Sequence, residues 1–176
     1  KRLGRGGMGT VYEATDTALE RRVAVKVIRE ELVGSAEAAE RFRREARTSA
    51  SFAHPNVVTV HDFGVAAGTR AFLVMELLQG ISLREQLRRE KRLPPPRVLS
   101  ILRGVCDAVE LAHRRHLIHR DLKPENIFLV QHGSGEVPKV LDFGVAKMLP
   151  TDTQVTRDAD TGAGHLVGTL RYMSPE

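Results

Sequence analysis

The segment best suited to catalysis is residues 119–126, with the sequence HRDLKPEN. It combines a histidine, acids and an amide, which are side chains that move protons or bind metal ions, and catalytic groups often lie on loops. Asp142 comes sixteen positions after Asn126 and follows the apolar pair 140–141, so its carboxylate is predicted at the end of a strand. A carboxylate with an amide oxygen suits Mg²⁺ when phosphate completes the coordination shell.

A glycine-rich segment near the first residue has the spacing of a phosphate-binding loop. Gly4, Gly6 and Gly9 form a G-x-G-x-x-G pattern that also contains Gly7 and is followed by Val11. A strand rather than a helix is predicted after the pattern, which disfavours a dinucleotide-binding fold. Glycines between two strands can place backbone N–H groups over phosphates. A plain turn between strands has the same composition and is the alternative.

Lys26 and Glu45 form a second pair of candidates. Lys26 shares a strand face with Ala24, whose small side chain leaves room for a flat ligand, although a single lysine in a strand can also be solvent-exposed. Glu45 lies next to Ala46 on the apolar face of a predicted helix, where a carboxylate is costly without a cation. We therefore expect Glu45 to pair with Lys26. The alternative is an exposed charge at the edge of the helix.

The elements around these residues indicate a strand-rich part followed by a helical part. Alternating apolar residues predict strands at 10–14, 22–28, 57–63 and 71–77. A helix is expected at about 35–51, with Ser35 as its N-cap. The change to helical character near 77–80 predicts a boundary between two lobes.

The helical part contains clear start signals. Residues 82–85 have the spacing of a capping box, and Pro94-Pro95-Pro96 begins a helix that extends to about His116. Its predicted apolar stripe consists of Val98, Leu102, Val105, Val109 and Ala112. Short strands are expected at 117–118, 127–130 and 137–141, with a hairpin at Gly133 and Gly135 between the last two.

Composition excludes several classes of protein. The 176 residues carry a net charge of +5 without a block of like charges, and only 5% are aromatic, so no nucleic-acid partner is expected. Apolar runs are far shorter than the about 18 residues of a membrane span, so we expect no membrane contact from this segment. The single cysteine, Cys106, excludes an internal disulfide and is predicted to be buried. A cytoplasmic location is the default expectation, although the full-length protein could be anchored to a membrane outside this segment.

These motifs, in this order and spacing, resemble the catalytic domain of eukaryotic-like protein kinases, and are most similar to bacterial serine/threonine kinases. The resemblance extends from the glycine-rich segment to residues 172–176, with the sequence YMSPE. It implies an α+β, two-lobed fold. Residues 1–78 would form a small antiparallel β-sheet lobe with one helix that binds ATP, and 79–176 would form part of a mainly helical catalytic lobe.

The resemblance implies a role for each candidate residue. It assigns ATP contacts to Gly4, Gly6, Gly7, Gly9, Val11, Ala24, Lys26, Met75, Glu76, Leu78 and Phe128. Val11 and Ala24 would sandwich adenine, Met75 would be the gatekeeper, and the backbone of Glu76 and Leu78 would hydrogen-bond adenine.

The remaining assignments concern the transferred phosphoryl group. Lys26 would bind the α- and β-phosphates and pair with Glu45, and Asp121 would accept the proton of the substrate hydroxyl. Lys123 would contact the γ-phosphate. Asn126 and Asp142 would hold Mg²⁺, with Mn²⁺ as a possible substitute.

The polar segment after Gly144 would be the activation segment. Arg120, next to the catalytic aspartate, is typical of kinases in which a phosphorylated loop residue supplies its counter-charge. The candidate phosphate acceptors are Thr151, Thr153, Thr156 and Thr161, of which we favour the last two, and Thr169 would contact the catalytic aspartate and lysine. The implied function is transfer of the γ-phosphoryl of Mg·ATP to Ser/Thr hydroxyls of protein substrates in bacterial signalling. Autophosphorylation in trans would require transient homodimers.

Two departures and two other interpretations complete the sequence analysis. Ser174 replaces the usual alanine of the Ala-Pro-Glu motif, and the chain ends at Glu176, so we expect an incomplete C-terminal lobe. A noncatalytic kinase-like scaffold is disfavoured because every assigned catalytic residue is present. A small-molecule phosphotransferase of similar fold is disfavoured by residues 123–125 (KPE) and by the long threonine-rich segment.

Overall fold

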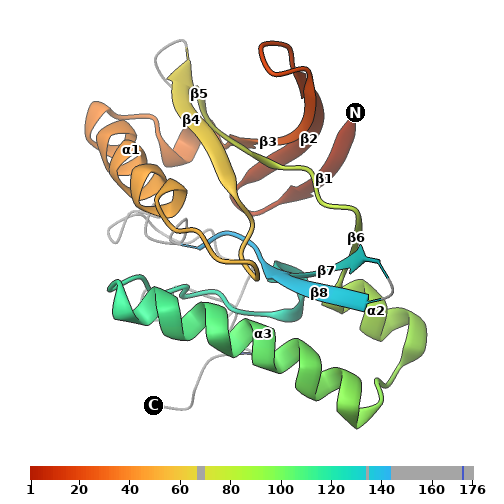
Figure 1. Ribbon diagram of the computed structural model, residues 1–176. Helices are drawn as coiled ribbons and strands as arrows, with labels where there is room; N and C mark the ends of the chain where they lie inside the picture. The colour runs from red at the N-terminus through yellow and green to blue at the C-terminus, as the bar shows by residue number, and fades with distance from the viewer. Residues whose placement is uncertain (67–69, 134, 144–171, 173–176) are drawn as a thin grey trace, which may run out of the picture.

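The computed structural model of this chain describes residues 1–66, 70–133, 135–143 and 172 (Figure 1). Within these residues, a five-stranded sheet has the order β1-β2-β3-β5-β4, and a three-stranded sheet has the order β6-β7-β8. Figure 1 shows α1 beside the first sheet, and α2 and α3 beside the second. This architecture confirms the expected kinase-like fold of a small antiparallel sheet with one helix, joined to a helical part.

All neighbouring strands of the first sheet are antiparallel. Its strands are β1 (Arg2–Gly6), β2 (Gly9–Asp16), β3 (Arg21–Ile28), β4 (Val60–Ala66) and β5 (Arg70–Glu76). The predicted strands at 10–14, 22–28 and 71–77 are present, whereas the one expected at 57–63 begins three residues later. On β3 the buried face carries Ala24, Lys26 and Ile28, because side chains alternate along a strand.

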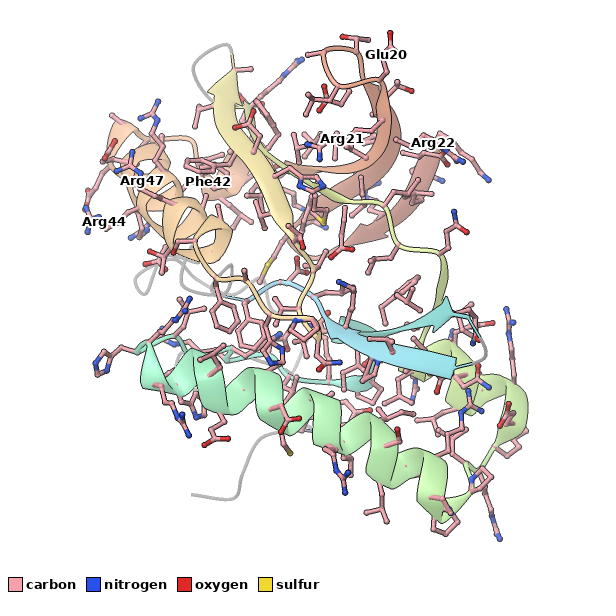
Figure 2. The ribbon with its side chains drawn as sticks, in the orientation of Figure 1. Glu20, Arg21, Arg22, Phe42, Arg44 and Arg47 are labelled. Carbon is pink, nitrogen blue, oxygen red and sulfur yellow. The ribbon has the colours of Figure 1, made fainter. Side chains whose placement is uncertain are left out.

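Helix α1 (Ala36–Ala50) follows a short 3₁₀ turn, η1 (Glu30–Leu32). The Ser35 hydroxyl accepts a hydrogen bond from the Ala38 N–H at 3.1 Å, which confirms the predicted N-cap. Figure 2 shows Phe42 pointing towards the sheet, whereas Arg44 and Arg47 point away from it. The helix thus buries an apolar face against the sheet and leaves Arg43, Arg44 and Arg47 exposed, whereas Arg41 is half-buried.

The described residues of the second part contain helical elements and the smaller sheet. Its elements are β6 (Gly80–Ser82), α2 (Leu83–Glu90), α3 (Pro95–Arg114), η2 (Pro124–Asn126), β7 (Ile127–His132) and β8 (Gly135–Val140). The Ser82 hydroxyl accepts from the Glu85 N–H at 3.1 Å, so the predicted helix start is confirmed. Within the described residues, no helix is long and apolar enough to cross a membrane.

Two residues of α3 that were expected to be buried, Leu102 and Cys106, are exposed. The buried stripe of α3 is Ile101, Val105, Ala108 and Ala112, whereas Leu102 is 47% exposed. Cys106 is also exposed. Residues 101, 105, 108 and 112 share one helical face, and each step of one residue turns the side chain by about 100°, so positions 102 and 106 leave that face.

The strand expected at 117–118 is absent from the described structure. Residues 117–119 have no regular secondary structure and lead from α3 towards Asp121 and the rest of the segment 119–126. The Leu117 N–H donates to the Ala112 carbonyl at 2.9 Å, and its side chain is buried. This bond caps the end of the helix, so the backbone is not available for a sheet.

The two parts are joined by backbone and side-chain contacts between residues 56–76 and β8. The Val140 N–H donates to the Asn56 carbonyl at 2.8 Å, and the Val58 N–H donates to the Val140 carbonyl at 3.0 Å. The Lys139 ammonium lies 2.7 Å from Oε1 of Glu76, which also accepts from the Thr59 N–H at 2.7 Å. The carboxylate at the end of β5 is therefore tied to β8.

We predict that Lys139→Met lowers the free energy of unfolding of this protein by about 1–3 kcal/mol, because the half-buried Glu76 carboxylate loses its cation. Chemical denaturation measures this change. Lys91→Met is the matched control, since Lys91 is exposed and makes no ion pair within the described residues. Equal stability of the two variants would contradict the prediction.

Candidate active site

A cavity of about 520 Å³ lies between the two sheets. Such a volume is typical of a small-molecule site. The predicted residues that line it are Gly4, Val11, Ala24, Lys26, Met75, Glu76, Leu78, Phe128 and Asp142. The sequence analysis missed several lining residues, including Leu3, Val58, Leu77 and Leu141, because only the folded chain brings them together.

One end of the cavity is a narrow apolar slot. Ala24 on β3 is paired in register with Met75 on β5, and both are buried. Val11 on β2 and Phe128 on β7 contribute further apolar surface from the two sheets. The small side chain of Ala24 leaves space between these layers, so the slot suits a flat, mainly apolar ring.

The glycine-rich segment forms the turn between β1 and β2. A side chain at Gly9 would place a Cβ 2.1 Å from the Val27 carbonyl oxygen, so this position requires glycine for close packing of β2 on β3. Gly4, Gly6 and Gly7 have no atom within 4 Å of such a Cβ, so packing does not explain them. Of the four predicted glycines, only Gly4 lines the cavity; the other three lie outside its lining.

Lys26 carries the buried positive charge of the site. Its Nζ lies 2.7 Å from Oδ1 of Asp142, and its side chain is 8% exposed. The predicted ion pair with Glu45 is therefore corrected, since the ammonium contacts Asp142 instead. Glu45 is half-buried on α1 and makes no ion pair within the described residues. A buried ammonium needs one close anion, and the carboxylate at the end of the β8 segment supplies it.

Asp121, Lys123 and Asn126 form a compact group beside this ion pair. The Lys123 ammonium lies 2.7 Å from Oδ2 of Asp121. The Asn126 side-chain amide donates to the Asp121 carbonyl oxygen at 2.8 Å and to Oδ2 at 3.2 Å. The Asp121 carboxylate is thus held by two partners while remaining partly exposed.

His119 is the first residue of the segment 119–126, and no role was predicted for it from the sequence. It is 4% exposed, and burial lowers the pKa of its imidazole below 6.5. Nδ1 accepts the Asp121 N–H at 3.2 Å, so the neutral ring carries its proton on Nε2 and donates it to the Leu141 carbonyl at 2.8 Å. His119 therefore links the backbone of Asp121 to the residue before Asp142.

Two of these loop residues have left-handed backbone conformations. The φ angle is +64° at Arg120 and +61° at Asp142, and neither residue is a glycine. Such angles cost energy and persist where surrounding contacts fix them. The hydrogen bonds of His119 with the Asp121 N–H and with the Leu141 carbonyl provide that support.

The donor set fits a magnesium ion. The Leu141 N–H donates to the Asn126 carbonyl at 2.8 Å, which places the segments of Asn126 and Asp142 next to each other. No group of three or more His, Cys, Asp or Glu residues that could hold a metal exists among the described residues. One carboxylate and one amide oxygen do suit Mg²⁺, which usually takes one or two carboxylates together with substrate phosphates.

Several predicted features lie outside the described residues. They include the activation segment after Phe143, the candidate acceptors Thr151, Thr153, Thr156 and Thr161, and also Thr169, Ser174 and Glu176.

Comparisons with known proteins agree with this geometry. A family model of the protein kinase domain matches residues 1–176. A probable serine/threonine-protein kinase of Streptomyces coelicolor is 41% identical over 177 residues, covering 99% of this chain and 25% of that protein. The serine/threonine-protein kinase PknE of Mycobacterium bovis is 42% identical over 174 residues, covering 99% of this chain and 29% of that protein. The chain thus spans less than a third of the length of these relatives.

A solved structure extends the comparison to the fold. The crystal structure of the PknI kinase domain of Mycobacterium tuberculosis matches with a TM-score of 0.72 and 31% identity. The match covers 82% of this chain and 58% of that chain. Because the family model covers every residue, this chain belongs to the protein kinase domain family.

Proposed function

We propose that the protein transfers the γ-phosphoryl group of Mg·ATP to serine and threonine hydroxyls of protein substrates. The observation that supports this most strongly is the juxtaposition of two residue groups. Lys26 and Asp142 line the cavity, whereas Asp121, Lys123 and Asn126 lie outside its lining. Asp121 is held by Lys123 and Asn126, and the segment of Asn126 lies beside that of Asp142, whose carboxylate contacts Lys26. The candidate base Asp121 and the candidate metal ligand Asp142 are each paired with a lysine, and their two segments lie next to each other.

The nucleotide would bind with its adenine in the apolar slot and its phosphates towards Lys26. Ala24 and Met75 border the slot. The Glu76 N–H is already used by the Thr59 carbonyl at 3.0 Å, which leaves the Glu76 carbonyl for the adenine edge. We accordingly assign residues 1–78 to an ATP-binding lobe and 79–176 to part of a catalytic lobe.

The reaction needs mainly placement and neutralisation of charge, because the transferred phosphoryl group is loosely bonded and anionic in the transition state. Lys26 and Lys123 supply positive charge at two points of the site. Mg²⁺, or Mn²⁺ in its place, when bound by Asn126 and Asp142, would neutralise further phosphate charge. Asp121 accepts the proton of the attacking hydroxyl, and its contacts with Lys123 and Asn126 keep its carboxylate oriented.

The proposal extends to regulation, partners and location. Protein substrates and ATP are the expected partners, with transient homodimers for autophosphorylation of the activation segment in trans. The proposed role is in bacterial signalling, and the similarity to bacterial proteins named serine/threonine-protein kinases supports it. A cytoplasmic location is consistent with a reduced single cysteine and with ATP as substrate.

Asp142→Ala should lower the rate of phosphotransfer at least about 100-fold, because the site loses its proposed metal-binding carboxylate. Transfer of labelled phosphate from ATP to a generic protein substrate measures the rate, and circular dichroism checks the fold. Asp107→Ala is the control, since Asp107 is exposed on α3. Wild-type activity in folded Asp142→Ala would refute the metal assignment.

The free energy of unfolding should fall as the pH drops below about 6.5. The pKa of His119 is lower when folded, so the unfolded chain binds a proton that the folded chain excludes, and the loss reaches at most about 1.4 kcal/mol per pH unit. The pKa of His61 is also lowered by burial and adds a contribution of the same sign. Denaturation between pH 5 and 7 should show a shallower dependence in His119→Gln. An unchanged slope would argue against a buried neutral imidazole.

Mass spectrometry of the protein after incubation with ATP should detect phosphate within residues 145–168, at Thr156 or Thr161. The physical reason is the positive charge of Arg120 next to the catalytic aspartate, which an added phosphate would neutralise. An Asp121→Asn variant, which lacks the base, serves as the control. Absence of phosphate from this whole segment in the active wild-type protein would contradict regulation by autophosphorylation.

A further inference from the structure

Ser49 is a buried polar residue for which the proposed chemistry has no use. The buried polar or charged residues of the described structure are Lys26, His119 and Ser49. The first two belong to the candidate site, whereas Ser49 lies on α1 and is 8% exposed. Its hydroxyl donates a hydrogen bond to the Phe143 carbonyl oxygen at 2.6 Å, across 94 positions of sequence.

Packing alone does not explain a serine at this position. The neighbouring buried residues on the same helical face are Phe42 and Ala46, both apolar. Alanine has a higher helix propensity than serine and needs no hydrogen-bond partner when buried. The serine is therefore explained by its bond to Phe143 rather than by the formation of the helix.

The hydrogen bond from Ser49 fixes the backbone directly after Asp142 in the sequence. Phe143 follows Asp142 directly, and its ring packs edge-on against His119 at 4.9 Å and against Phe52 at 5.5 Å. The ring and the carbonyl of Phe143 are thus both held. Because the φ angle of Asp142 is +61°, this strained residue depends on restraint from its neighbours.

The backbone before Asp142 in the sequence is fixed by hydrogen bonds to Asn126 and His119. The Leu141 N–H donates to the Asn126 carbonyl at 2.8 Å, and the Leu141 carbonyl accepts from His119 at 2.8 Å. Residues 119–126 therefore hold the backbone before Asp142, whereas Ser49 of α1 holds the carbonyl of the residue after it. Removal of the Ser49 hydroxyl would leave the Phe143 carbonyl without that partner. The backbone after Asp142 would then lose its hydrogen-bond restraint.

We propose that Ser49 is a positioning residue that keeps the Asp142 backbone in its left-handed conformation and so maintains the carboxylate for metal binding. This inference rests on the proposed function, in which Asp142 is a ligand of Mg²⁺. It predicts that the hydroxyl of Ser49 affects the metal-dependent part of nucleotide affinity, and not the part that comes from the apolar slot.

Calorimetry of ADP binding to the full-length protein, with Mg²⁺ and with EDTA, tests the proposal. The ratio of the two dissociation constants reports how much Mg²⁺ tightens binding. In Ser49→Ala this ratio should fall about five- to tenfold, while the affinity in EDTA stays within about twofold of wild type. Ser49→Thr retains a hydroxyl and should restore most of the ratio. Ser51→Ala is the matched control, because Ser51 donates to the Thr48 carbonyl on the exposed end of the same helix.

The outcomes separate the two proposals. A wild-type protein whose ADP affinity does not depend on Mg²⁺ would overturn the proposed metal site itself. A wild-type ratio above one that Ser49→Ala leaves unchanged, or an equal loss of affinity with and without Mg²⁺, would overturn the role of Ser49 alone. If Ser49→Ala does not fold, Ser49→Cys replaces it under the same criteria, since a thiol has similar size and donates only weakly.

Discussion

The ion pair between Lys26 and Asp142 is the interaction on which the rest of the structure depends. The ammonium comes from the middle of β3 and the carboxylate from the segment after β8, so each part of the fold supplies one charge. Removing one partner of a buried pair is strongly unfavourable, because the other charge is then left without compensation. The two sheets must therefore meet in an arrangement that brings these two residues together, and that arrangement encloses the cavity.

Hydrogen bonds to backbone atoms convert this arrangement into a defined site. Three side chains bind backbone carbonyls at or beside the two acids. Asn126 binds the carbonyl of Asp121. His119 and Ser49 bind the carbonyls before and after Asp142. Backbone atoms move less than long side chains, so these bonds fix where Asp121 and Asp142 begin. The carboxylates are held in turn, that of Asp121 by Lys123 and Asn126 and that of Asp142 by Lys26. This is the kind of preorganisation that catalysis by placement requires.

The sequence predicted local features well and long-range pairings poorly. The caps at Ser35 and Ser82 and the alternation of β3 follow from residues within one turn or one strand, so they were predictable. The buried face of α3 was misjudged at Leu102, because a small error in helical phase exchanges neighbouring faces. The partner of Lys26 was also misjudged, since Glu45 and Asp142 are both acids of the expected site and only the folded geometry selects between them. His119 and Ser49 were missed because their roles depend on contacts far away in sequence.

The charges of the site are balanced in pairs, and this has a consequence for nucleotide binding. Lys26 contacts Asp142, and Lys123 contacts Asp121, each at 2.7 Å. A bound polyphosphate with its divalent ion brings both signs of charge into the same space. In the proposed complex each lysine would exchange a carboxylate for phosphate, and the carboxylates would be available to the cation or to the substrate hydroxyl. Because each charge exchanges one partner for another, the buried ammonium of Lys26 avoids the cost of being left unpaired. The two ion pairs are therefore suited to binding a metal–nucleotide complex by exchange of partners.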